Sequence, residues 1–328
     1  NCTDGSYPNV NLSGATVVQK TIDAFVEKYS KEYNLNREQR DKYLDLVSLG
    51  TIADSIDLAN PEARYYAVEG LKPKYENNEC IKEICLQAEY EMKMGKTIKT
   101  IGFNIAPCMK AIVRYGKPAD EKKGIQSEFE ILFRALINEQ ETFVYQPRRK
   151  CKDDPKPESQ YHSLQKTSAR LATNAHSRQS KAVSILVDKL VDKVDKTSQV
   201  VIVNATEDME DQDKNSTGLV ANKLMTRFGK PAFVLNGKGG SGRSNAIGRL
   251  VNARDFFNSS GLIEVKGHPR AFGIKSLPNV KAFLDFCNKN ILDEELVNAS
   301  EVDFEVAPDK IRQKDINEIG KYLSLFGS

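Results

Sequence analysis

The sequence has 328 residues, of which 40% are hydrophobic and 28% charged, with a formal net charge of +3. A chain of this length predicts about two domains, each with a sizeable core. No apolar run approaches the roughly 18 residues that a membrane-spanning helix needs, so the composition is that of a soluble globular protein. The small net charge means that any nucleic-acid site must come from local clusters of basic residues.

The cysteines and histidines limit the kinds of metal site that the chain can build. Six cysteines are dispersed along the sequence, and none forms a C-x-x-C pair. This pattern favours reduced thiols in the cytoplasm over a disulfide framework or a zinc site. Only three histidines are present, so a metal site would have to rest on carboxylates.

The first half of the chain shows mainly helical spacing of its apolar residues. Ser13, Asn36 and Asn60 each precede such a stretch and predict helix N-caps, because their side chains can accept bonds from unpaired backbone N–H groups. Residues 97–105 are rich in β-branched side chains and predict a short strand or a buried turn. The predicted helices cover residues 12–33, 36–49, 60–71, 79–94 and a segment from 116 to about 136.

The second half changes to a strand–helix–strand pattern. Residues 147–157 carry three prolines without apolar spacing, which predicts a linker, and a long helix follows over residues 159–196. The remaining predicted elements are strands at 199–204, 231–235 and 243–247, with an amphipathic helix at 217–228 that ends at Gly229. This order indicates an α/β domain with helices on its sheet.

Two glycine-rich segments, Gly237–Ser244 and Gly267–Gly273, are candidates for phosphate binding. Glycines let the backbone approach a ligand closely, and successive N–H groups in a turn can form an anion-binding nest. Arg243 adds a guanidinium group that suits a phosphate, and His268 adds an imidazole. The alternative is a glycine-rich β-hairpin followed by an unrelated tight turn.

Four segments together resemble one family. Leu44–Asp54 resembles the fourth motif of the DHH phosphoesterase superfamily, in its RecJ-type branch of single-strand exonucleases. Ser216–Ala232 resembles the matching helix and strand of the associated DHHA1 domain, and Gly240–Ser244 and Gly267–Gly273 resemble the two substrate-binding signatures of that domain. The order and spacing of all four agree, so the resemblance covers most of the chain.

The resemblance implies an α/β fold with a particular domain order. The expected parts are the mostly helical C-terminal part of a DHH domain over residues 1–146, a linker with a long connecting helix over residues 147–197, and an α/β DHHA1 domain over residues 198–328.

The resemblance makes Asp54 the expected catalytic metal ligand. The family binds two divalent cations, Mn²⁺ or Mg²⁺, and hard cations of this kind prefer carboxylate oxygen. The alternative is an aspartate that only ends a helix. The Asp-His-His triplet that names the family does not occur in these 328 residues, so the remaining ligands are expected upstream of Asn1 and the chain alone is expected to be inactive.

The resemblance also supplies candidate substrate contacts. Ile105–Arg114 resembles the fifth motif of the family, in which Arg114 matches one expected arginine, whereas Cys108 stands where another is usual and Lys110 where an asparagine is usual. Arg64 matches an arginine that follows the aspartate motif, and a solvated basic surface is the alternative for these cations. In the DHHA1 signatures, the expected phosphate and backbone contacts are Gly240, Ser241, Gly242, Arg243, Ser244, Gly267 and His268.

The sequence therefore predicts a single-strand-specific 5′→3′ DNA exonuclease that hydrolyses phosphodiesters with divalent metal. Two alternatives remain open: a DHH/DHHA1 phosphodiesterase of short oligoribonucleotides or cyclic dinucleotides, and a catalytically dead replication scaffold. The expected partners are single-stranded DNA, the N-terminal part of the DHH domain, and replication or repair proteins, with no membrane.

Overall fold

The computed structural model describes residues 7–9, 12–88, 96–149, 155–237, 239–245, 247–296 and 306–321. The chain divides into two compact units, Asn1–His176 with Ala307–Ser328, and Ser177–Val306. Within the described residues, no helix combines the length and the apolar character that a membrane span requires.

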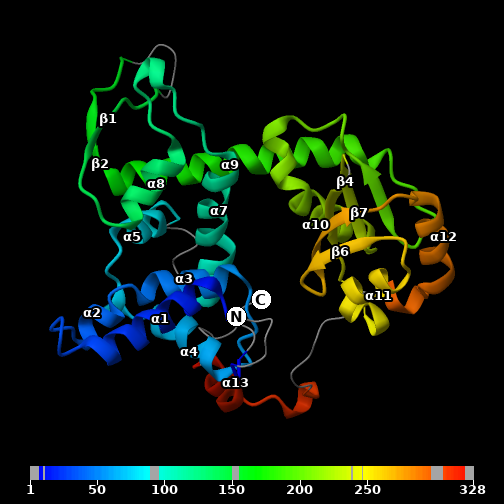
Figure 1. Cartoon of the computed structure of the whole chain (residues 1–328), viewed down its shortest axis with the longest axis horizontal. Coiled ribbons are helices and arrows are strands. Elements are labelled where there is room, and N and C mark those ends of the chain that lie inside the picture. The colour runs from blue at the N-terminus through cyan, green and yellow to red at the C-terminus, as the bar shows by residue number, and fades with distance from the viewer. Residues whose placement is uncertain are drawn as a thin grey trace. The chain divides into compact units, whose positions relative to one another are not determined.

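The first unit is mostly helical, as predicted. Ser13, Asn36 and Asn60 cap α1, α2 and α4 with their side-chain oxygens, which confirms the three predicted N-caps. Its core is dominated by isoleucine and alanine side chains. The helices are α1 (Gly14–Tyr29), α2 (Arg37–Asp41), α3 (Leu44–Ala53), α4 (Pro61–Glu69), α5 (Glu79–Gln87), α6 (Ile98–Thr100), α7 (Ala106–Tyr115), α8 (Glu128–Leu136) and α13 (Gln313–Gly320) (Figure 1).

Several predicted boundaries in this unit were wrong. The helix expected over residues 36–49 is two helices, because Tyr43 leaves helical dihedral angles (φ −115°, ψ 22°). The helix expected from residue 116 begins only at Glu128, where the Ser127 hydroxyl accepts the backbone N–H of Glu130. The helix expected over residues 79–94 ends at Gln87, and the predicted residues 89–94 lie outside the described part of the chain.

The strand or turn expected at residues 97–105 is helical. Ile98–Thr100 forms α6, and Ile101–Ile105 forms a π-helix that leads into α7. Pro107 explains the wider turn, because proline has no N–H to give to the carbonyl four residues earlier and its ring clashes there. The Ala106 N–H instead donates to the Ile101 carbonyl, five residues back. The helical hydrogen bonds of residues 98–105 therefore override the local β-propensity of this segment.

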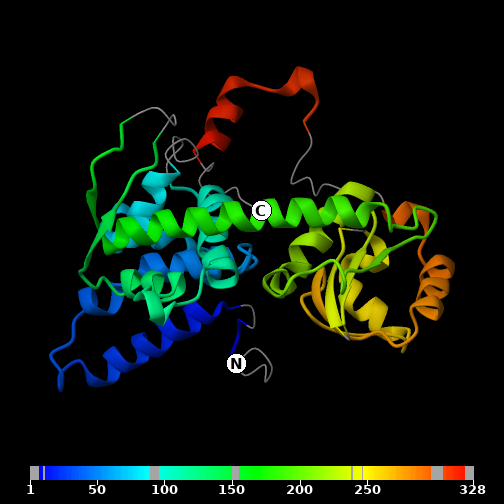
Figure 2. The ribbon, with the colours of Figure 1, turned by 90° about the horizontal axis from the view of Figure 1, so that it is seen from above.

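A long helix, α9 (Leu164–Val191), follows a short antiparallel pair formed by β1 (Thr142–Tyr145) and β2 (Gln160–Ser163). The prediction of a long helix is confirmed, although its first expected residues belong to β2. The helix is continuous (Figure 2). Its first half buries alanines in the core of the first unit, and its second half buries residues such as Leu186 and Leu190 in the core of the second unit.

The second unit contains a five-stranded sheet in the order β3 (Val201–Asn204), β4 (Ala232–Asn236), β5 (Gly239–Arg243), β7 (Ala271–Ser276), β6 (Glu264–Gly267). Strands β3 and β4 are parallel and are connected through α10 (Thr217–Phe228), which confirms the predicted strand–helix–strand unit. Alternate strand residues pack against α9 and α10 on one face, and against α11 (Ala253–Ser259) and α12 (Val280–Asn290) on the other (Figure 1). The predicted α/β class is confirmed.

The glycine-rich segment was placed wrongly by sequence. It is not a turn that leads to a strand at residues 243–247, because Gly239–Arg243 is itself strand β5, between β4 and β7. Glycine is depleted in strands, so the glycine-rich composition of this segment predicted a turn. The turn between β4 and β5 begins at Gly237, which has a φ of 65°.

Candidate functional site

Asp54 lies at the C-terminal end of α3, in the first unit. Its backbone N–H donates to the Gly50 carbonyl at 3.1 Å, so it ends the helix. Its side chain is exposed, and its carboxylate makes no hydrogen bond or ion pair with the described residues. Ser55 follows with a φ of 51°, which turns the chain away from the helix axis. Asp54 thus ends the helix and also presents an unbonded carboxylate to solvent.

Buried hydroxyl groups fix the end of α3 against the start of α1. The hydroxyls of Ser13, Thr16 and Thr51 bond one another at 2.9 to 3.2 Å. Gly50 allows this close approach, because a Cβ there would lie 2.5 Å from the Ala15 Cβ. Since buried hydroxyls need partners, this cluster is specific for one register of the two helices, which positions the residues before Asp54.

Lys110, a cation of α7, lies near Asp54. The Lys110 ammonium donates to the Ala53 carbonyl. Burial of this group lowers the pKa of Lys110, the Asp54 carboxylate opposes that shift, and Arg114 adds to it. Lys110 therefore lies within electrostatic reach of both Asp54 and Arg114, and a substrate contact by either cation stays a prediction.

Arg64 has a different position. Its Nε donates to the Leu58 carbonyl at 2.7 Å, so its guanidinium braces the loop between α3 and α4. The rest of its side chain is exposed. Its visible role is to hold the segment that follows Asp54.

A pocket of about 140 Å³ opens beside the end of α3. It is bounded by the last turn of α3, the π-helix and the first turn of α7, and Lys110 contributes to its wall. Its lining residues are Ile52, Ala53, Ser55, Gly102, Phe103, Ala106, Pro107 and Lys110.

In the second unit, alternate residues of β5 face opposite directions. Ser241 and Arg243 face the start of α10: the Ser241 hydroxyl lies 2.8 Å from the Thr217 hydroxyl, and a Cβ at Gly218 would lie 2.5 Å from Arg243 Nη2. A helix N-terminus offers unpaired N–H groups and a partial positive charge. The Arg243 guanidinium therefore lies against a second source of positive potential, an arrangement suited to a phosphate.

Gly240 and Gly242 lie in the middle of the sheet. Gly242 pairs with Phe233 and Phe272, and a Cβ there would lie 2.1 Å from the Phe272 ring. At Gly240, a Cβ would lie 2.1 Å from the Val234 carbonyl oxygen. Close packing accounts for glycine at both positions, and an assigned ligand contact for them stays a prediction.

The two glycine-rich segments are neighbours in space. Arg243 pairs with Ala271, and the Ser244 N–H donates to the Arg270 carbonyl at 3.0 Å. His268 lies in the turn between β6 and β7 with an exposed side chain, and Gly267 before it has a φ of 125°. The Arg254 guanidinium braces this turn through the Gly267 carbonyl. The two segments thus lie side by side in the sheet, and binding of one phosphate by both stays a prediction.

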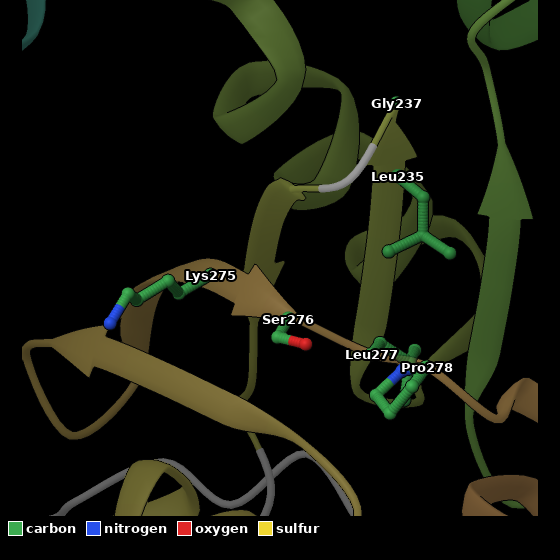
Figure 3. A pocket seen from close by; sticks show the side chains of 6 residues that line it. All are labelled: Leu235, Gly237, Lys275, Ser276, Leu277 and Pro278. Carbon is green, nitrogen blue, oxygen red and sulfur yellow. The ribbon is translucent and has the colours of Figure 1, made fainter.

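A larger hollow of about 370 Å³ lies at the ends of β4 and β7 (Figure 3). Of the two glycine-rich segments, only Gly237 lines it, and Gly240–Ser244, Gly267 and His268 do not. Lys275 at its edge pairs with Glu264 at 2.9 Å. The other lining residues are Leu235, Gly237, Ser276, Leu277 and Pro278.

Comparison with known proteins finds similarity to single-strand DNA-specific exonucleases along nearly the whole chain. The sequence is 28% identical over 339 residues to the putative SPbeta prophage-derived single-strand DNA-specific exonuclease YorK of Bacillus subtilis, covering 98% of this chain and 54% of that protein. It is 24% identical over 335 residues to the single-stranded-DNA-specific exonuclease RecJ of Bacillus subtilis, covering 98% of this chain and 36% of that protein. The chain is RecJ-like.

The fold agrees with that relationship. The solved structures of Thermus thermophilus RecJ in complex with Mg²⁺ and with Mn²⁺ each match 80% of this chain with a TM-score of 0.53, at 17% and 18% identity. The match covers 36% of the Mg²⁺-bound RecJ chain and 35% of the Mn²⁺-bound RecJ chain. The RecJ-like chain spans about half the length of YorK and about a third of RecJ. No protein-family model matches it.

The described residues of this RecJ-like chain offer one candidate metal ligand, Asp54, and do not form a complete metal centre. Among the described residues, no group of three or more His, Cys, Asp or Glu could hold a metal ion. Asp54 supplies one accessible carboxylate, and Mg²⁺ commonly uses one or two carboxylates with several waters. A two-metal centre would need further ligands from outside the described residues.

Some residues that shape both regions carry no signal in the sequence. Thr217 and Gly218 give Arg243 its place at the start of α10, and Thr51 fixes the helix that carries Asp54. Thr217, Gly218 and Thr51 could have been predicted only from their positions within the segments that resemble the family, because the residues they contact lie far away in the sequence. Phe103 was also missed, since a phenylalanine in an apolar segment is expected to be buried.

Proposed function

We propose that this RecJ-like chain forms the substrate-binding part of a metal-dependent exonuclease specific for single-stranded DNA, with 5′→3′ polarity. The observation that carries the proposal is the Arg243 guanidinium at the start of α10, beside the His268 turn, in a chain similar to single-strand DNA-specific exonucleases over 98% of its length. This surface suits a sugar–phosphate backbone and requires no paired bases.

The second unit would bind the strand. Arg243 and the N–H groups of the first turn of α10 would hold one phosphate, and His268 would donate to a neighbouring backbone oxygen. Arg254 keeps the His268 turn in place through the Gly267 carbonyl. These contacts position the strand and read no base sequence.

The first unit would act at the scissile phosphate. Lys110 and Arg114 offset its negative charge, and Lys110 does so as a point charge because it lacks the planar fork of an arginine. Asp54 would be one ligand of a divalent cation. When bound, such ions activate a water molecule and stabilise the charge on the departing oxygen. The other ligands would come from a segment that the longer relatives have and this chain does not cover.

We further propose that the protein works in the cytoplasm, in DNA repair or recombination, together with replication or repair proteins. The support for this proposal is the similarity of the chain to RecJ.

Competition binding tests the proposal. The chain should bind long single-stranded DNA more tightly than duplex DNA or dinucleotides, and the binding should weaken with salt, because phosphate contacts release counterions. Equal affinity for dinucleotides would instead favour a phosphodiesterase of short substrates. A protein that binds no nucleic acid would favour a scaffold.

A further inference from the structure

One wall of the pocket beside Asp54 is an exposed aromatic ring. Phe103, in the π-helix, lines the pocket and remains 60% exposed. An exposed phenylalanine keeps a large apolar surface in water, although the adjacent core holds many buried isoleucines. The ring therefore offers an apolar surface at the opening of the pocket.

The backbone keeps this wall in place. Phe103 lies in the π-helix, which is closed by the Ala106 N–H donating to the Ile101 carbonyl and is followed by Pro107, which has no N–H to donate to the Phe103 carbonyl. Gly102 lets this segment lie close to α3, because a Cβ there would be only 3.3 Å from Ile52 Cγ2. Ile52 and Pro107 complete apolar walls around the opening.

The volume of the pocket matches one aromatic ring. An apolar cavity of about 150 Å³ accommodates benzene, and this pocket measures about 140 Å³. A six-membered pyrimidine ring is of that size, whereas the fused rings of a purine exceed it.

The charges around the pocket match a nucleotide. Lys110 forms part of the wall, and Arg114 follows it by one helical turn on α7. Asp54 stands between the lining residues Ala53 and Ser55. An apolar slot for a base is thus flanked by two cations for a phosphate and by the proposed metal ligand.

We infer that this pocket binds a single nucleobase, preferably a pyrimidine, at one end of the DNA strand, and that Phe103 stacks on it. The inference rests on the proposed function, because it assigns the base of the nucleotide whose phosphate lies at Lys110 and Arg114. Stacking on an aromatic side chain tolerates sequence variation, so the pocket would recognise the presence of a terminal base.

The experiment measures binding of the full chain to a labelled oligothymidylate of about 12 nucleotides by fluorescence anisotropy. One set of strands carries a single abasic nucleotide at the 5′ end, at the 3′ end or in the middle. The wild-type chain should lose roughly 5- to 150-fold in affinity when one particular terminal base is removed, the range expected for a stacked base.

Phe103→Ala should bind the complete strand as weakly as the wild type binds that abasic strand, and it should be insensitive to the terminal base. Phe103→Tyr should restore the wild-type behaviour. Val113→Ala is the matched control, because Val113 is also 60% exposed and lies on α7 outside the pocket, and it should bind like the wild type.

Each contrary result has a distinct meaning. Strong binding that does not depend on either terminal base overturns the inference and leaves the proposed function intact, and this comparison needs no variant. An equal loss for complete and abasic strands in Phe103→Ala also overturns it. A terminal adenine that binds as tightly as a terminal thymine contradicts the size match. No binding of single-stranded DNA by the wild-type chain contradicts the proposed function itself.

Discussion

Replacing Gly242 by alanine should destabilise the second unit. Gly242 lies in β5 between β4 and β7, and its missing side chain leaves room for the Phe272 ring. The substitution separates two interpretations of the glycine-rich segment, because a glycine needed only for phosphate binding could become alanine with little loss of stability.

The size of the effect follows from the contacts. The new Cβ would lie 2.1 Å from Phe272 Cε2 and 2.8 Å from Cδ2 and Cζ, well inside van der Waals distance. Phe272 is only 2% exposed and packs near the Phe233 and Phe257 rings, so it cannot move into solvent. Overpacking of this kind costs about 1 to 3 kcal/mol.

Urea unfolding followed by circular dichroism measures this cost from the midpoint and slope. The matched control is Gly273→Ala on the neighbouring strand β7, where the nearest atom would be 3.8 Å away, and it should change the free energy of unfolding by less than about 0.5 kcal/mol. Equal midpoints for Gly242→Ala and Gly273→Ala would refute the packing argument.

Two further predictions concern the same unit. Arg243→Ala should weaken binding of single-stranded DNA by roughly 10- to 150-fold, because a charge-assisted hydrogen bond to a phosphate is lost. The control is Arg227→Ala, at an exposed position on α10, which should change the affinity little. Similar losses in both variants would remove Arg243 from the binding surface. Glu295→Gln should lose stability at neutral pH, because the hydrogen bond from Arg249 holds the pKa of Glu295 below its ordinary 4.5. A lowered pKa contributes stability above pH 4.5 that is lost as the pH falls through the folded value, so wild type and variant should converge in acid. A pH-independent difference between their unfolding free energies would contradict this assignment.

The parts of the fold that sequence predicted are those with local signals. Ser13, Asn36 and Asn60 are N-caps because their side chains bond backbone groups two or three residues away, and Gly229 ends α10 with a φ of 66°. Such contacts depend on neighbouring residues and can be inferred from spacing. The long helix α9 was predictable for the same reason.

The parts that sequence missed depend on distant partners. Strand β5 depends on its pairing with β4 and β7, and its Gly242 leaves space for Phe272, about thirty residues away. The π-helix at Ile101–Ile105 depends on Pro107 and on packing against Ile52, which outweigh its β-branched composition. At the site, the family resemblance indicated Asp54, Lys110 and Arg114 individually, whereas the closeness of Lys110 to Asp54 and of Arg243 to Gly218 depends on residues far apart in the sequence.

The central claim is that Asp54 serves metal-dependent cleavage while the remaining residues of this chain bind the strand. Its most direct test compares the wild type and Asp54→Ala, each joined to the segment proposed to supply the other metal ligands, for Mn²⁺-dependent degradation and for binding of single-stranded DNA. Because the Asp54 carboxylate bonds to none of the described residues, its removal should leave folding and affinity unchanged while cleavage is abolished. Continued degradation by Asp54→Ala at the wild-type rate would contradict the account.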